Sequence, residues 1–199
     1  MPKYRKPARR HIHSGEPVDA TIDRNAVERR EIIIAGAIDH NVMYYLTRLF
    51  RYFAAVSKAP ITVILNTPGG SIVDGLAIYD LIRMTTAKGI KVNVLAIGSC
   101  MSMGTIILQA ATHRSCTKNT AFLLHEVQTI SIGVRSMSEG KDLQGDVERV
   151  QGVLNEILAQ RTGMPEKKLR KLYERRDLYL TAQDALQHKL VDEVIDYDK

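Results

Sequence analysis

Short runs of β-branched residues alternate with apolar stripes of helical spacing along most of the sequence. The run Ile32, Ile33 and Ile34 is typical of a strand covered on both faces, because such strands need no polar alternation. The predicted strands, each with the helix that follows it, are 31–36 with 42–53, 61–65 with 72–86, and 91–97 with 103–111. Since strands joined through helices run parallel, this order predicts an α/β fold with a largely parallel sheet and helices packed on its faces.

The two ends of the chain are less regular. The later elements predicted are a strand over 121–127, a long helix marked by apolar residues between 143 and 158, a basic helix over 165–173, a short strand over 178–180 and a closing strand over 190–195. The first residues lack apolar periodicity and contain Pro2, Pro7 and Pro17, which is typical of an arm or loop. We therefore expect a basic N-terminal arm over 1–27 and a single domain over 28–199.

The charge of the chain is concentrated at its N-terminus. The formal net charge is +6, and most of the excess comes from Lys3, Arg5, Lys6, Arg9 and Arg10. We interpret this cluster as a solvated tail rather than a nucleic-acid-binding surface, with docking to an acidic partner as the alternative.

No apolar run approaches the ~20 residues of a membrane span, and no signal peptide is recognisable, so we expect no membrane association and a cytoplasmic location. Cys100 and Cys116 lack the spacing of a metal site or a disulfide framework.

Two polar motifs lie where a predicted strand gives way to a helix. Gly69 and Gly70 let the backbone turn sharply and present N–H groups to an oxyanion, although paired glycines often mark only a turn. Ser102 is placed at a helix N-terminus, where serine is either a nucleophile near free N–H groups or an ordinary helix cap. Cys100 prevents a match to the Gly-x-Ser-x-Gly elbow of α/β-hydrolases.

Two further motifs supply a base and an acid. His125 ends an apolar run, and a strand end at the same edge of the sheet would bring its imidazole within reach of the Ser102 hydroxyl. A half-buried structural histidine is the alternative. Asp177 precedes the short strand and would hold the imidazole in its reactive tautomer, or else form a surface ion pair with Arg175 or Arg176.

Taken in order, these motifs resemble the proteolytic subunit of the Clp protease. They are Asn-Thr-Pro-Gly-Gly, Ser-Met-Gly, the apolar segment ending in histidine and Arg-Asp-x-x-Leu-Thr-Ala, and the resemblance covers about 32–195. It implies a ClpP/crotonase-like spiral of β-β-α units with a protruding handle over about 126–162. It also implies a serine endopeptidase of unfolded proteins or peptides, with a catalytic triad of Ser102, His125 and Asp177 and an oxyanion hole formed by the N–H groups of Gly70 and Met103.

The resemblance further implies an assembly. Family members form heptameric rings stacked in pairs, Arg176 matches a ring-contact arginine, and a ring ATPase commonly delivers the substrate. Nothing in this sequence encodes ATP binding, so we expect no cofactor and no metal in this chain, with ATP entering only through such a partner.

The chain departs from the family pattern in three places. Cys100 and Met101 stand where small alanines are usual, the Gln-Pro and glycine-rich segment after the histidine is replaced, and the basic arm does not match the axial loop. Two other functions therefore stay open. One is a catalytically silent ring subunit, and the other is an acyl-CoA hydratase or isomerase of the crotonase superfamily, which shares the fold. The sequence does not separate a housekeeping peptidase from a specialised one, such as a viral protease.

Overall fold

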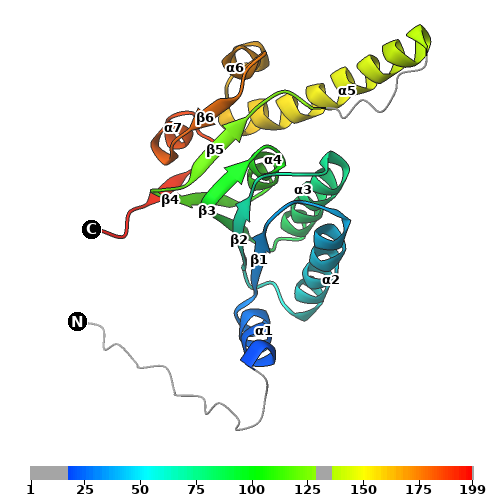
Figure 1. Ribbon diagram of the computed structural model, residues 1–199. Coiled ribbons are helices and arrows are strands. Elements are labelled where there is room, and N and C mark those ends of the chain that lie inside the picture. The colour runs from blue at the N-terminus through cyan, green and yellow to red at the C-terminus, as the bar shows by residue number, and fades with distance from the viewer. Residues whose placement is uncertain (1–17, 129–135, 199) are drawn as a thin grey trace.

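A computed structural model describes residues 18–128 and 136–198, and Figure 1 shows their arrangement. The elements in chain order are α1 (Val18–Arg29), β1 (Glu31–Ala35), α2 (His40–Val56), β2 (Ile61–Thr67), α3 (Ile72–Ala87), β3 (Val92–Met101), α4 (Met103–Gln109), β4 (His113–Thr117), β5 (Ala121–Leu124), α5 (Met137–Thr162), α6 (Glu166–Tyr173), β6 (Leu178–Leu180), α7 (Ala182–Gln187) and β7 (Glu193–Ile195). The three strand–helix pairs at the start of the domain confirm the predicted alternation.

The strands form one sheet that branches at β3. Strands β1, β2, β3, β4 and β7 lie in that order and run parallel, which confirms the predicted parallel sheet. The first part of β3 pairs with β4, whereas Ser99–Met101 at its end pairs with β5. β5 in turn pairs antiparallel with β6. The branch brings the end of β3, the end of β5 and the start of β6 to one edge of the sheet.

The hydrophobic core lies between the sheet and helices α2, α3 and α4. Apolar side chains that reach it include Leu46, Phe50, Phe53, Ile78, Ile82 and Ile107 from the helices and Val63, Leu65, Val94 and Ala96 from the strands. The expectation that the first strand is covered on both faces is wrong. Ile32 and Ile34 are buried, but Ile33 is 55% exposed, because successive side chains point to opposite faces of a strand and the described residues cover only one face of β1.

Helix α1 occupies the end of the segment predicted as an arm or loop, so that prediction is wrong from Val18 onward. Residues 1–17, which include the basic cluster, lie outside the described part. The helix has a weak apolar stripe, which periodicity does not detect, and among its described side chains Val27 packs against the core. Arg30 fixes the joint between α1 and β1, because its buried guanidinium donates to the carbonyls of Phe53 at 3.0 Å and Pro60 at 3.3 Å.

Two elements, β4 and α7, lie where the sequence analysis predicts none, and β3 continues past its predicted end at 97 to Met101. β4 has a polar sequence because two of its buried side chains, Arg114 and Ser115 on opposite faces of the strand, are polar. α7 is too short for a helical period, and its start is instead marked by a capping box of Thr181 and Asp184. Local polar chemistry rather than hydrophobic pattern defines these two elements.

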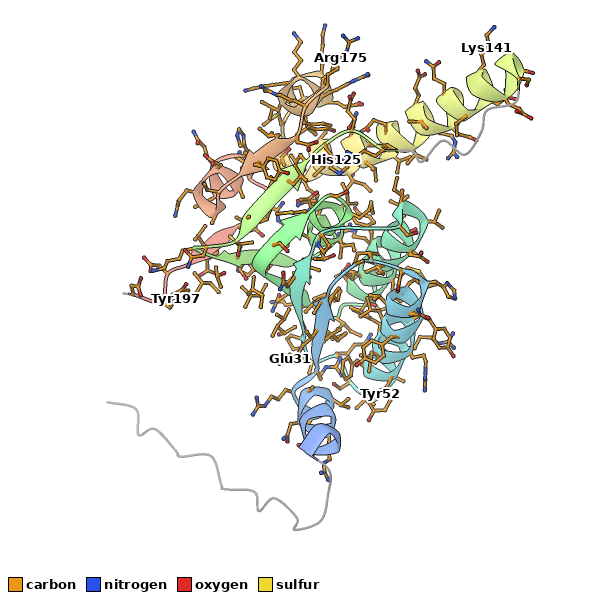
Figure 2. The ribbon with its side chains drawn as sticks, in the orientation of Figure 1. Glu31, Tyr52, His125, Lys141, Arg175 and Tyr197 are labelled. Atoms are coloured by element: carbon orange, nitrogen blue, oxygen red, sulfur yellow. The ribbon has the colours of Figure 1, made fainter. Side chains whose placement is uncertain are left out.

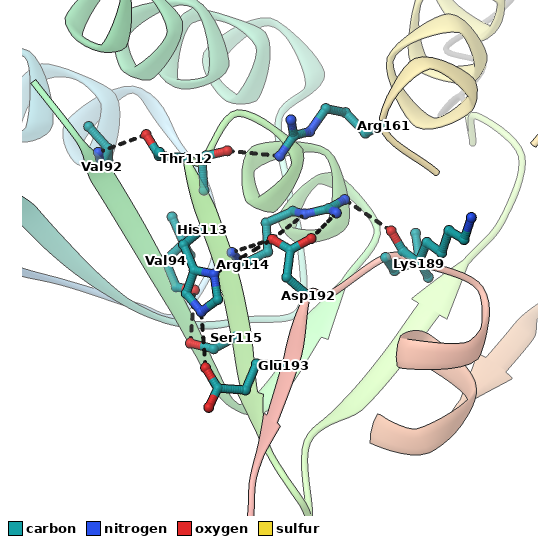
Figure 3. A network of polar contacts seen from close by, with 12 residues as sticks. Val92, Val94, Thr112, His113, Arg114, Ser115, Arg161, Lys189, Asp192 and Glu193 are labelled. Atoms are coloured by element: carbon teal, nitrogen blue, oxygen red, sulfur yellow. Dashed lines mark hydrogen bonds and ion pairs between the residues drawn. The ribbon is translucent and has the colours of Figure 1, made fainter. Parts of the chain in front are cut away.

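A buried polar network, drawn in Figure 3, ties α4 to the C-terminal part of the chain. The Arg114 guanidinium pairs with the Asp192 carboxylate and donates to Gln109 Oε1 at 2.6 Å and the Lys189 carbonyl at 3.0 Å. Gln109, which is fully buried at the end of α4, donates to the carbonyls of Thr105 and Leu190. The network fixes the helix that begins directly after Ser102.

Helix α5 projects away from the body in Figure 1, as the predicted handle should. Its first half is exposed, whereas Leu154, Ile157 and Leu158 near its end are buried against the domain. The helix stops at Gly163, which takes a left-handed conformation with φ 70°. Part of the predicted handle, residues 129–135, lies outside the described residues.

Across the described helices, none has the length and apolar character that crossing a membrane requires.

Candidate active site

Ser102 is the single residue between β3 and α4, and its backbone is strained. It has φ 51° and ψ −121°, a region that residues with a side chain rarely adopt and that often occurs at functional sites. Its N–H donates to the Leu123 carbonyl at 2.9 Å, which fixes it against β5. Ser102 occupies the N-cap position of α4, as the cap interpretation expects, but its hydroxyl makes no capping hydrogen bond to the helix.

The Ser102 hydroxyl instead faces His125. The distance from Ser102 Oγ to His125 Nε2 is 2.9 Å, within hydrogen-bond reach. The pairing of Met101 with Leu123 aligns the ends of β3 and β5, and His125 directly follows β5 (Figure 2). The structure therefore brings together the two residues that the sequence analysis names as nucleophile and base.

The second ring nitrogen of His125 fixes the tautomer. Nδ1 lies 2.6 Å from the backbone carbonyl oxygen of Glu126. A carbonyl oxygen can only accept, so Nδ1 carries the hydrogen in this contact. In the neutral ring Nε2 is then unprotonated and accepts the Ser102 hydroxyl hydrogen. This is the state in which an imidazole can take a proton from serine.

Asp177 reaches the same site without touching the imidazole. The antiparallel pairing of Leu124 with Leu178 makes His125 and Asp177 the next pair along the two strands, and both line one cavity. Among the described residues, however, no hydrogen bond or ion pair joins the Asp177 carboxylate to His125, Arg175 or Arg176. In this structure the Glu126 carbonyl accepts the hydrogen bond from His125 Nδ1, whereas the sequence analysis assigns that role to the Asp177 carboxylate.

The neighbours of Asp177 contact other groups. The Arg175 backbone N–H donates to Glu126 Oε2 at 3.0 Å, which ties the turn before β6 to the segment after His125. The Arg176 guanidinium donates to the Leu172 carbonyl at 2.7 Å, back along α6. Arg176 is not one of the residues that line the cavity. Its expected role in a contact within the ring stays a prediction.

The paired glycines lie against Ser102. Gly69 and Gly70 have φ of 100° and 149°, and the backbone of Ile38 binds both sides of this segment. A Cβ on Gly69 would lie 2.6 Å from Ser102 Cβ, and one on Gly70 would lie 2.3 Å from the Ile38 carbonyl oxygen. The glycines are therefore required for close approach and do more than form a turn.

Two backbone N–H groups beside Ser102 are available to a ligand. Gly70 and Met103 both line the cavity. Within the part of the chain that the structure describes, no carbonyl or side chain accepts a hydrogen bond from either N–H. Met103 is the first residue of α4, where N–H groups have no partner inside the helix. This pair fits the predicted oxyanion hole and could stabilise a negative oxygen.

The cavity beside Ser102 has a volume of about 500 Å³. Apolar side chains on α3, α4 and α5 form much of its wall, namely Ile72, Ile106, Leu154 and Leu158. Gln151 and Tyr173 add polar groups that the sequence analysis does not identify. Gln151 gives no signal in the sequence, because it is one polar residue beside the apolar stripe of a long helix.

The thiols near the site are not alternative nucleophiles. Cys100 is buried, and that burial raises the pKa of its thiol far above the ordinary value, with a smaller contribution from Cys116. Burial likewise raises the pKa of Cys116 to about 11. Among the described residues, no group of three or more histidine, cysteine, aspartate or glutamate side chains is arranged to hold a metal ion.

We expect Gly69→Ala to lower kcat/KM for a peptide substrate about 10²-fold, because the added methyl displaces Ser102 from His125. Gly36→Ala is the matched control. Gly36 has a similar φ of 98°, but an added Cβ there would meet nothing within 4 Å. Equal losses in the two variants would show that backbone strain, rather than contact with Ser102, causes the effect.

Comparison with known proteins identifies similar chains along almost the whole length. The Clp protease family model matches residues 14–198. ATP-dependent Clp protease proteolytic subunit 2 of Pseudomonas aeruginosa is 30% identical over 181 residues, which cover 89% of this chain and 87% of that protein. Subunit 3 of Rhizobium etli is 30% identical over 182 residues, 90% of each chain. A solved structure of a ClpP1 mutant from Listeria monocytogenes has a TM-score of 0.79 at 23% identity, covering 89% of this chain and 98% of that one. This last likeness confirms the predicted spiral fold.

Proposed function

This chain belongs to the Clp protease family, and we propose that it is an active serine endopeptidase with Ser102 as nucleophile and His125 as general base. One observation carries the proposal. Ser102 Oγ lies 2.9 Å from His125 Nε2, at the strained junction between β3 and α4. The contact of His125 Nδ1 with the Glu126 carbonyl leaves Nε2 free to accept a proton. A catalytically silent subunit would not need this arrangement.

The proposed reaction follows from these positions. Ser102 Oγ attacks the peptide carbonyl while its proton passes to His125 Nε2. The N–H groups of Gly70 and Met103 receive the oxyanion, and the imidazolium then gives its proton to the leaving amine. Water releases the acyl group by the same steps in reverse. Asp177, which also lines the cavity, stabilises the imidazolium charge while it exists and completes the proposed triad.

The proposed substrate is a polypeptide with an apolar side chain next to the scissile bond, since the cavity beside Ser102 is largely apolar. We further propose that the chain works in the cytoplasm in heptameric rings stacked in pairs, with Arg176 at a ring contact. The relatives are named as subunits of ATP-dependent proteases, which supports a partner ATPase as the source of unfolded substrate. In this proposal the chain itself needs no cofactor or metal.

A fluorophosphonate probe tests the function directly. We expect the purified chain to be labelled at Ser102 only, as located by mass spectrometry of the digested protein, and to cleave a peptide with leucine before the scissile bond. Native mass measurement of the same sample reports ring assembly. Assembled rings without labelling or cleavage would establish the silent-subunit alternative. Conversion of an enoyl-CoA by unlabelled protein would establish the crotonase-type alternative.

A further inference from the structure

The peptide unit between Glu126 and Val127 is held on both sides. Its carbonyl accepts from His125 Nδ1 at 2.6 Å, and its N–H donates to Gln151 Oε1 on α5 at 2.7 Å. A trans peptide is planar, with its C=O and N–H pointing in opposite directions. The direction of the N–H therefore sets the direction of the carbonyl that faces the imidazole.

Gln151 is itself held in one orientation. Its Nε2 donates to Asn155 Oδ1 at 2.9 Å and lies 3.5 Å from the Tyr173 hydroxyl, which also donates to Asn155 Oδ1. Burial raises the pKa of Tyr173 to about 12, so this hydroxyl keeps its proton at neutral pH. A flipped Gln151 amide would place its NH₂ against the Val127 N–H and its oxygen against Asn155 Oδ1. Both contacts would be repulsive, so the network keeps Oε1 facing Val127.

The rest of the network anchors these groups to the fold. Asn155 is 2% exposed and its Nδ2 donates to Glu166 Oε1 at 3.4 Å, at the start of α6. Tyr173, at the end of α6, is also 2% exposed. Two buried side chains from two helices thus support one half-buried glutamine.

We propose that Gln151 is a positioning residue for the catalytic base. It holds the Glu126–Val127 peptide so that the carbonyl binds His125 Nδ1–H, which leaves Nε2 as the acceptor for Ser102. Without this support the peptide can rotate, Nδ1 loses its acceptor, and the tautomer with hydrogen on Nε2 becomes populated. That tautomer cannot accept the Ser102 proton. The inference rests on the proposed function, because it concerns His125 as the base.

Gln151→Leu removes the acceptor for Val127 N–H and keeps a side chain of similar size. We expect kcat for peptide hydrolysis to fall about 10²-fold with KM changed less than about twofold, because the base is misplaced while the substrate cavity keeps its shape. Gln151→Glu retains an oxygen that accepts from Val127 N–H but turns its second oxygen toward Asn155 Oδ1, so we expect a kcat between those of Gln151→Leu and wild type. Gln160→Leu is the matched control, since Gln160 is an exposed residue on the same helix whose side-chain amide donates to the exposed Glu156.

A second readout does not depend on turnover. Nitrogen NMR spectra of protein labelled at histidine report which ring nitrogen of His125 carries hydrogen, with the His125 signals assigned by their loss in His125→Ala. We expect the Nδ1–H tautomer in wild type and Gln160→Leu, and a mixture in Gln151→Leu.

The outcomes separate this inference from the proposed function. If wild type cleaves peptides but Gln151→Leu matches Gln160→Leu in kcat and in tautomer, Gln151 does not position the base. Loss of activity in Gln151→Leu with an unchanged tautomer would indicate a structural role and overturn the inference. If wild type cleaves nothing, the proposed function fails, and the tautomer spectra alone decide whether Gln151 orients His125.

Discussion

Ser102→Ala should lower kcat for peptide hydrolysis about 10⁶-fold, the largest effect expected of any single substitution here. The substitution removes the atom that attacks the carbonyl, and no nearby group can replace it. The thiol of Cys100, on the preceding strand, is buried and protonated. The residual rate should come only from the oxyanion N–H groups and substrate binding, which do not involve the hydroxyl.

The measurement compares kcat and fluorophosphonate labelling for Ser102→Ala, His125→Ala and the double variant. Because serine and histidine act as one unit, the double variant should lose no more activity than either single variant. Ser99→Ala is the control, since Ser99 lies near the end of β3, the strand before Ser102, and its hydroxyl donates to Asn66 Oδ1 at 2.9 Å. Additive losses in the double variant, or a Ser102→Ala rate near that of Ser99→Ala, would mean that another residue is the nucleophile.

The fold could be predicted from the sequence where hydrophobic pattern and chain order agree. The isoleucine run of β1 and the apolar stripe of α2 place both elements, and their repetition predicts a parallel sheet. The pattern does not show what neighbours each face meets. Ile33 has the same residue type as Ile32 and Ile34, and it is exposed because it points to the face of β1 that no described element covers. Arg114 is buried because Asp192, distant in sequence, pairs with it, so no local pattern could place β4.

The candidate site likewise has a part that the sequence predicts and a part that depends on contacts between distant residues. Ser102 and His125 could be predicted because each ends a strand and the strands of a sheet end at a common edge. The partner of His125 Nδ1 could not be predicted, because it is a backbone carbonyl whose direction depends on Gln151, on the helix α5 that follows. Side-chain motifs identify which residues can react. Backbone geometry decides which of them are aligned, and Asp177 shows that a shared cavity and strand register do not guarantee a hydrogen bond.

Asp192→Asn should destabilise the fold by about 3 kcal/mol at neutral pH, the largest effect expected on stability. Arg114 is 5% exposed, so its charge would remain buried without a counter-charge. Asp192 is more accessible, with its side chain 35% exposed, and asparagine still offers one acceptor, so the expected cost lies at the low end for broken buried pairs. Urea unfolding at fixed protein concentration measures the difference. Asp196→Asn, which weakens the surface pair with Lys118 but keeps an oxygen that accepts from the Asp198 N–H, should change stability by less than about 1 kcal/mol.

The Arg114–Asp192 pair also predicts how the stability of the fold depends on pH. Burial on its own would raise the pKa of Asp192, but the hydrogen bonds and charge of Arg114 outweigh burial and hold the pKa below its ordinary value. A carboxyl whose pKa is lower in the folded state stabilises the fold fully above its unfolded pKa of ~3.9, and this contribution is lost as pH falls through the folded value. The stability gap between wild type and Asp192→Asn should therefore stay constant from about pH 7 to about pH 5 and narrow below ~4. A gap that persists unchanged in acid would mean that shape and hydrogen bonding, rather than the charge of Asp192, stabilise α4 behind Ser102.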